Sequence, residues 1–180
     1  MTREMTESFA DLLRAQVRNE FTASQQYIAL AVWFDNHDLP RLAMHFYRQS
    51  VEERNHAMMF VQYLLDRDLD IAIQDVGGVL NDFSAPAELI ELALHQEKEV
   101  TAQVERLFRA ARAEDDVLGE QFMMWFLKEQ VEEVAAMNTL LAIATRAGAQ
   151  WFQIEEHLAR ETVGDAGIDP AAPPAAGGAL

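Results

Sequence analysis

Four stretches of the chain repeat an apolar residue at alternating steps of four and three, and this spacing constrains the fold more than any other feature. Steps that average about 3.5 residues place successive side chains along one face of an α-helix, whereas a strand needs steps of two. The four stripes lie within residues 9–34, 42–63, 90–111 and 119–144. The sequence therefore predicts four long helices, each with one buried face.

Turn residues separate the first two stripes. The first helix is expected from about Thr6 to Phe34, and Asn36-His37-Asp38 then breaks its pattern. Asp38 with Pro40 predicts the start of the second helix, because proline is favoured in the first helical turn. We expect that helix to run to about Asp66.

The later helices have their own boundary signals. Ser84-Ala85-Pro86 offers a cap with proline in the first turn of the third helix, and Glu114-Asp115-Asp116 offers an acidic cap for the fourth. Gly148 ends the fourth helix, and a short amphipathic helix is expected from Ala149 to about Glu161. Residues 164–180 are rich in Ala, Pro and Gly without a pattern, which predicts a flexible tail.

The connections determine how the four helices are arranged. Residues Asp68–Phe83 contain Gly77-Gly78 and β-branched residues but no helical period, so we interpret them as one long connection. Short, long and short connections make a four-helix bundle in which the second and third helices run parallel. The fold class is therefore all-α. We divide the chain into a helical domain, residues 1–161, and the tail, residues 162–180.

Composition restricts the partners. The chain has 30 acidic and 14 basic residues, a formal net charge of −16, which repels nucleic acid and attracts metal cations. Cysteine is absent, which excludes disulfides, thiolate metal sites and cysteine nucleophiles and fits a reducing cytoplasm. Neither a signal peptide nor a membrane-spanning apolar run is recognisable. We expect a cytoplasmic protein with no nucleic-acid or membrane partner.

Polar residues interrupt every apolar stripe near its midpoint. In a bundle, four such interruptions come to the same level and form a buried cluster of four carboxylates and one imidazole. Buried like charges force protonation or unfolding unless a cation compensates them, and four negative charges balance two divalent metal ions. Carboxylates with one histidine suit iron or manganese and tolerate zinc. The interrupting residues are Glu20, Glu53 with His56, Glu97, and Gln130 with Glu133.

Tyr27 and Gln130 can contact the metal ligands. Tyr27 follows Glu20 by two helical turns on the same stripe, so its hydroxyl can reach a metal ligand. Gln130 can donate to a ligand or to bound oxygen. A structural pair in the core is the competing interpretation of Glu53 and His56 alone, and the other three helices favour the metal site.

Several segments resemble the non-haem bacterial ferritins, most closely the actinobacterial kind. The resemblance covers about Phe9 to Glu161, and implies a ferritin-like four-helix bundle with a long crossover and a short fifth helix. It also implies a hollow shell of 24 subunits that oxidises Fe(II) with O2 at a dinuclear ferroxidase centre and stores ferric mineral. The segments are Asn19–Tyr27, Glu52–Ala57, Gly119–Phe122 and Trp125–Gln130 with Glu133.

The resemblance also assigns roles to residues. Glu20, Glu53 and His56 match the ligands of a first iron, and Glu53 would bridge to a second iron held by Glu97 and Glu133. Gln130 matches the glutamine of the ferritin centre. A nearby third iron site would use Glu133 with three further acids, for which a solvated or cavity-facing carboxylate is the competing interpretation. Those acids are Glu52, Glu129 and Glu132.

The resemblance also leads to expectations about iron entry, haem binding and iron release. Glu120 falls where an acid lines the three-fold entry pore, while Met123 departs from the second pore acid of animal ferritins. Bacterioferritins carry a second Glu-x-x-His and a methionine after the bridging glutamate. Here the matching positions are Gln130-x-x-Glu133 and Arg54, so we expect no haem. Release of stored iron would need a reductant that the sequence does not identify.

Three other classes of function compete with storage. A diiron oxidoreductase or peroxidase of the rubrerythrin type would want an electron-delivery module, often rich in cysteine, and the chain has no cysteine. A mini-ferritin that coats DNA binds its metal between subunits and would be repelled by the charge of −16. The third is a structural cage or chaperone whose metal only stabilises the bundle.

Overall fold

The computed structural model describes residues 7–161 and 169–180, and the described part contains helices and no strand. This confirms the all-α fold. The helices are α1 (Phe9–Asp35), α2 (Pro40–Asp66), α3 (Pro86–Ala113), α4 (Val117–Ala147) and α5 (Phe152–Arg160). None of the described helices is long and apolar enough to cross a membrane.

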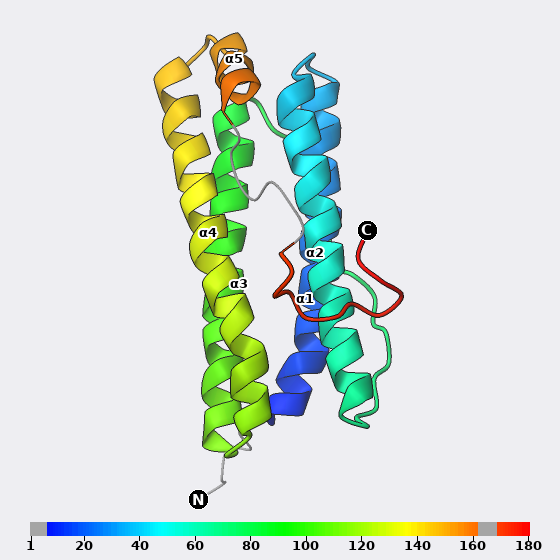
Figure 1. Ribbon diagram of the computed structural model, residues 1–180. Helices are drawn as coiled ribbons and strands as arrows, with labels where there is room; N and C mark the ends of the chain where they lie inside the picture. The colour runs from blue at the N-terminus through cyan, green and yellow to red at the C-terminus, as the bar shows by residue number, and fades with distance from the viewer. Residues whose placement is uncertain (1–6, 162–168) are drawn as a thin grey trace, which may run out of the picture.

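The four long helices form two antiparallel pairs, α1 with α2 and α3 with α4 (Figure 1). The connection formed by residues 67–85 contains no helix and runs the length of the bundle, so α2 and α3 are parallel as predicted. The short helix α5 contacts α2 and α4 at one end of the bundle.

Most of the predicted boundary signals lie at helix ends. Ser8, which was not among the predicted signals, caps α1 by accepting a hydrogen bond from the Asp11 backbone N–H at 3.2 Å. Asp116 caps α4 by accepting from the Gly119 N–H at 3.0 Å, and Gly148 ends α4 with φ of 54°. Pro86 is the first residue of α3, but the side chain of Ser84 bonds to Glu88 and does not cap the helix.

The start of α2 differs from the prediction. Asp38 has φ of 57° and lies in the turn after α1, while Leu39 occupies the capping position without a side-chain hydrogen bond. The buried carboxylate of Glu155 on α5 accepts from the backbone N–H of Arg41 at 3.0 Å and of Leu42 at 2.9 Å. The cap therefore comes from a helix more than 100 residues away, which local sequence signals do not reveal.

The buried apolar residues fall into two separate clusters. One surrounds Tyr27, Phe34 and Phe46 at the end of the bundle that carries α5, and the other surrounds Phe60 and Phe126 toward the opposite end. The polar residues that interrupt the four stripes lie between these clusters along each helix. The core is thus divided by a polar layer.

The sequence predicts a flexible tail, but residues 169–180 lie against α2 and α4 (Figure 1). Ala176 donates its backbone N–H to the Met58 carbonyl at 3.0 Å, and Asn55 exchanges hydrogen bonds with the Leu180 backbone. Trp125 donates its indole N–H to Asp169 at 3.0 Å. Ala- and Pro-rich composition disfavours a regular element, yet methyl groups and backbone amides can still cover an apolar surface. Residues 162–168 lie outside the described chain.

Candidate metal centre

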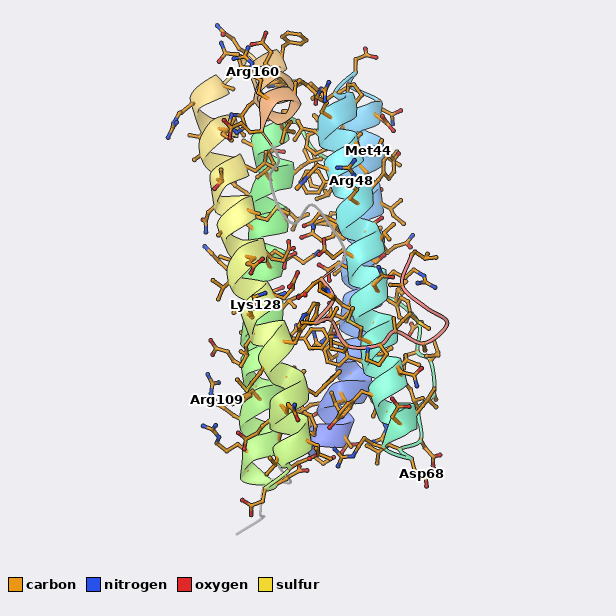
Figure 2. The ribbon with its side chains drawn as sticks, in the orientation of Figure 1. Met44, Arg48, Asp68, Arg109, Lys128 and Arg160 are labelled. Carbon is orange, nitrogen blue, oxygen red and sulfur yellow. The ribbon has the colours of Figure 1, made fainter. Side chains whose placement is uncertain are left out.

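Six polar side chains from all four long helices are buried in the polar layer. None of them is more than 2 % exposed. Figure 2 shows side-chain oxygen atoms in the space between the two helix pairs, about halfway along the bundle. The six residues are Glu20, Glu53, His56, Glu97, Gln130 and Glu133.

Glu20, Glu53 and His56 form the tightest group in this layer. Each offers one ligand atom, and the three atoms lie within 4.8 Å of one another. His56 Nδ1 lies 3.2 Å from Glu53 Oε2, because the two residues are one turn apart on α2. Glu53 also shares a hydrogen bond with Glu20, which requires a proton between the two carboxyl groups in the metal-free protein.

Glu97 has three polar neighbours on other turns and helices. The Tyr27 hydroxyl donates a hydrogen bond to the Glu97 carboxylate. Thr101 Oγ1 lies 2.9 Å from Gln130 Oε1, which leaves the amide N–H group of Gln130 to bond to Glu97. The hydrogen bonds from Tyr27 and Gln130 orient the Glu97 carboxylate.

The buried carboxyl groups have pKa values above the ordinary range. Burial is the first cause for all four, and it raises the pKa of Glu97 to about 7. For Glu53 the next causes are the charges of Glu97 and Glu20, and for Glu133 they are those of Glu52 and Glu97. Burial lowers the pKa of His56 to about 4, so its imidazole is neutral at pH 7 and can bind metal.

Three carboxylate oxygen atoms in the layer are buried without a hydrogen-bond partner in the described chain. They are Glu20 Oε2, Glu97 Oε2 and Glu133 Oε2. A buried unsatisfied oxygen is costly, and a bound cation would remove that cost. The set of hard oxygen donors with one imidazole fits iron. The residues present therefore suit the metal that the sequence implies.

The expected third site is brought together only in part. Glu52, His56 and Glu129 offer ligand atoms within 4.8 Å of one another, and Glu129 is 3 % exposed. Glu132 is exposed and its carboxylate lies 3.6 Å from the Lys128 ammonium group, so it is not part of this group. His56 thus lies between the buried layer and the outer acids, a position that the sequence does not suggest.

A cavity of about 510 Å³ opens beside these outer acids. Glu52, His56 and Glu129 line it, and Asp169 and Leu180 of the docked tail form part of its wall. The cavity gives the centre a route to solvent along the surface between α2 and α4.

Glu120 lies at the start of α4, far along that helix from the buried layer. Its carboxylate pairs with Arg112 at 2.8 Å within the same chain. The pore role of Glu120 stays a prediction, since it depends on neighbouring subunits.

Sequence reasoning assigned no role to three polar residues that contact the centre. Gln16 donates to Glu20 at 2.9 Å, Gln49 hydrogen-bonds to Glu133, and Thr101 contacts Gln130. Gln16 and Gln49 lie one turn before Glu20 and Glu53 on their stripes, and Thr101 lies one turn after Glu97. A polar residue one turn from a buried carboxylate on the same helix is the signal that could have found them.

Comparisons with known proteins agree on one family. The family model of the ferritin-like domain matches residues 10–147 of this chain. The chain is 62% identical to the ferritin BfrB of Mycolicibacterium smegmatis over 172 residues, which cover 96% of this chain and 94% of that protein. It is 33% identical to the bacterial non-heme ferritin of Staphylococcus aureus over 144 residues, which cover 80% of this chain and 87% of that protein.

Solved structures show the same fold. A humanized archaeal ferritin superposes with a TM-score of 0.82 at 23% identity, covering 90% of this chain and 100% of its own. An open pore ferritin from Archaeoglobus fulgidus gives 0.82 at 22% identity, covering 88% and 100%. These findings confirm the four-helix bundle with its fifth helix and the resemblance found in the sequence.

Proposed function

The chain belongs to the ferritin family, and we propose that it is an iron-storage ferritin whose buried polar layer is a dinuclear ferroxidase centre. Family and fold support iron storage. The finer proposal is that each chain oxidises Fe(II) with O2 and that 24 chains form a cytoplasmic shell around ferric mineral. Protection against iron-driven oxidation would follow, since ferrous iron is removed from solution.

The centre would bind two ferrous ions as substrate. Glu20, Glu53 and His56 would hold the first, and Glu53 would bridge to the second on Glu97 and Glu133. Because the carboxyl groups have raised pKa values, binding would release the protons that the metal-free layer retains. The neutral His56 needs no deprotonation, so it adds a ligand without adding charge.

Charge balance favours release of the ferric product from the buried layer. Four carboxylates neutralise two ferrous ions. Oxidation would transfer two electrons to O2 and add two positive charges, which hydroxide ligands from water, rather than further protein carboxylates, would offset. Glu52 and Glu129 share His56 with the centre and line the cavity of about 510 Å³, so they offer ferric iron a more exposed set of oxygen ligands. We propose that iron leaves by this side, and that Glu132 and Glu120 act only outside the centre.

Other chains of the same kind would complete the shell. Val117, Met124 and Val131 occur at steps of seven on one face of α4 and are 61 % to 72 % exposed. Such a face is expensive to leave in water and suits contact with another subunit. The small-molecule partners would be Fe(II) and O2. The reductant that releases the stored iron is unidentified. We expect no haem and no nucleic-acid or membrane partner.

The observation that carries the proposal is the set of unpartnered carboxylate oxygens on three helices at one level. The test adds ferrous iron aerobically to iron-free protein and follows oxidation. Glu53→Ala should slow oxidation by orders of magnitude, whereas Glu99→Ala, an exposed acid on α3, should not. Oxidation by Glu53→Ala at the parental rate would refute this centre. Rapid turnover without iron retention would instead favour a diiron oxidoreductase.

A further inference from the structure

A second cavity lies at the end of the bundle that carries α5, and the proposed function does not use it. Its volume is about 220 Å³. Arg41, His45 and Arg48 line it from α2, and Arg160 and Glu161 line it from the end of α5. Figure 2 labels Arg48 on α2 and Arg160 on α5.

The charge of this cavity is opposite to that of the chain. Three arginines and a single carboxylate line it, although the whole chain has 14 basic and 30 acidic residues. Within the described residues, neither Arg41 nor Arg48 has a carboxylate within ion-pair distance, and Arg160 has only the exposed Glu156 at 3.8 Å. Positive charges that line one cavity repel one another, and a bound anion would relieve that repulsion.

His45 belongs to the wall of the same cavity. Its ring lines the wall and packs edge-on against Phe46, while its Nε2 atom is buried and has no hydrogen-bond partner among the residues described. Burial, followed by the charge of Arg48, lowers the pKa of His45 to about 4. The imidazole is therefore neutral at pH 7 and adds no charge to the cavity.

The N-terminus of α2 does not offer its first amides to an anion. The first amides of α2, those of Arg41 and Leu42, already donate to Glu155. An anion in this cavity would therefore be held by side chains. Arginine binds tetrahedral oxyanions well, because its planar fork of N–H donors matches two oxygens at once.

We propose that this cavity binds inorganic phosphate through Arg41, Arg48 and Arg160, beside the neutral ring of His45. The cavity of about 220 Å³ is smaller than most pockets for organic ligands, which commonly measure about 300–1,000 Å³. A free phosphate ion therefore fits it better than an organic phosphate. Glu161 is the single carboxylate among the lining residues, so the lining has an excess of positive charge. This site is separate from the metal centre and stands or falls independently of the ferroxidase proposal.

The cavity lies on the same face of α2 as the outer acids of the metal centre. Met44 and Arg48 also line the larger cavity beside Glu52 and Glu129, so both cavities open on the same face of α2. Phosphate held here would lie on the surface over which metal ions reach or leave the acids. An oxyanion and a hard cation would thus be brought together on one face of the subunit.

The test is calorimetric titration of the assembled, iron-free protein with inorganic phosphate at constant ionic strength. We expect saturable binding of one phosphate per chain, and at least tenfold weaker binding in Arg41→Gln/Arg48→Gln. The matched control is Arg106→Gln/Arg109→Gln, which removes the same charge from exposed residues of α3 and should bind like the parent. His45→Gln, which leaves the charge unchanged, should bind within a few-fold of the parent.

Three results would overturn the proposal. One is the absence of saturable binding, and another is an equal loss in the α3 control, which would mean that only net charge matters. The third comes from competition with adenosine monophosphate. If the nucleotide binds more tightly than free phosphate, the source of the phosphate group is an organic ligand and the assignment is wrong. Circular dichroism of each variant verifies that the helices are retained.

Discussion

Single side chains decide the chemistry of the polar layer, and Tyr27 illustrates how. Its ring is fully buried in the apolar cluster next to Phe46, while its hydroxyl donates to Glu97. Burial and the charge of Glu97 raise the pKa of Tyr27, so the hydroxyl keeps its proton and remains a donor. From the spacing of Tyr27 and Glu20 the sequence predicted only that this hydroxyl can reach a metal ligand. That the hydroxyl bonds to Glu97 on α3 depends on how the helices pack.

Tyr27→Phe removes that donor and leaves the ring in place. Residues that orient metal ligands commonly contribute about 10–100-fold to affinity, so we expect ferrous iron to bind roughly tenfold more weakly. Anaerobic titration of the iron-free protein measures this. Tyr47→Phe removes an exposed hydroxyl that bonds to Asp35 and should leave the affinity unchanged. Equal losses in the two variants would show that Tyr27 does not act on the centre.

The raised pKa values predict how stability depends on pH. Glu97 has a pKa of about 7 in the folded, metal-free protein and an ordinary pKa of 4.5, so its protonated form favours folding. That contribution is complete below about pH 4.5 and is lost as pH rises through 7. His56, with a pKa lowered to about 4 from 6.5, favours folding in its neutral form and opposes this trend only below pH 6.5.

The iron-free protein should therefore melt at a lower temperature at pH 8 than at pH 6.5, and Glu97→Gln should flatten that slope. Calorimetry in metal-free buffer measures both. Excess zinc should reverse the trend, because metal binding requires the deprotonated carboxylates. An unchanged slope in Glu97→Gln would show that this carboxyl group does not titrate as the burial indicates.

At the scale of helices and segments, contacts between distant parts of the chain determine features that local sequence signals do not predict. Caps within one turn, such as Asp116 on α4, were predictable, since the capping side chain is adjacent to its amide. The Glu155 cap on α2 and the docked tail were not, because both depend on which elements meet in space. Repeat spacing identifies a helix face, but it does not say which distant segment covers that face.

Glu155→Ala should destabilise the iron-free protein by about 1–2 kcal/mol, the usual value of a helix cap. The reason is that two amides at the start of α2 lose their acceptor. Glu156→Ala on the same helix removes only an exposed contact at 3.8 Å to Arg160 and should change stability by less than about 0.5 kcal/mol. Denaturant unfolding compares the two variants, and equal effects would contradict the cap.

Deletion of residues 169–180 tests the docked tail. Loss of the Ala176, Asn55 and Trp125 hydrogen bonds and of methyl cover should cost about 1–3 kcal/mol, which lowers the melting temperature by roughly 2–12 °C. Differential scanning calorimetry of the iron-free protein measures the shift. An unchanged melting temperature would mean that the tail is free in solution, as the composition first suggested.

For the whole molecule, the sequence predicted the bundle and the level at which its polar residues meet. Four stripes of the same period leave few other ways to bury their apolar faces. The sequence did not predict that His56 would lie within reach of both Glu53 and Glu129, or that Glu132 would face solvent beside Lys128. Neighbouring positions such as Glu132 and Glu133 differ by about 100° around a helix, so packing, rather than motif, decides which acid is buried.

The proposed assembly makes its own prediction. Met124→Lys should weaken the shell, because it places a charge at the centre of the apolar face of α4 formed with Val117 and Val131. Sedimentation should show 24 copies of the 20.3 kDa chain for the parent and smaller species for the variant. His95→Lys adds a charge at an exposed position of α3 and serves as the control. A full shell in Met124→Lys would remove this face from the interface.

The central claim is that two iron ions bind among Glu20, Glu53, His56, Glu97 and Glu133 in every chain. Anomalous diffraction at the iron edge, from crystals soaked in ferrous iron without oxygen, tests it most directly. The account predicts two peaks per chain on either side of the Glu53 carboxylate, and neither peak in Glu53→Ala crystals soaked alongside. Iron found only at Glu52 and Glu129, with none beside Glu53, would contradict it.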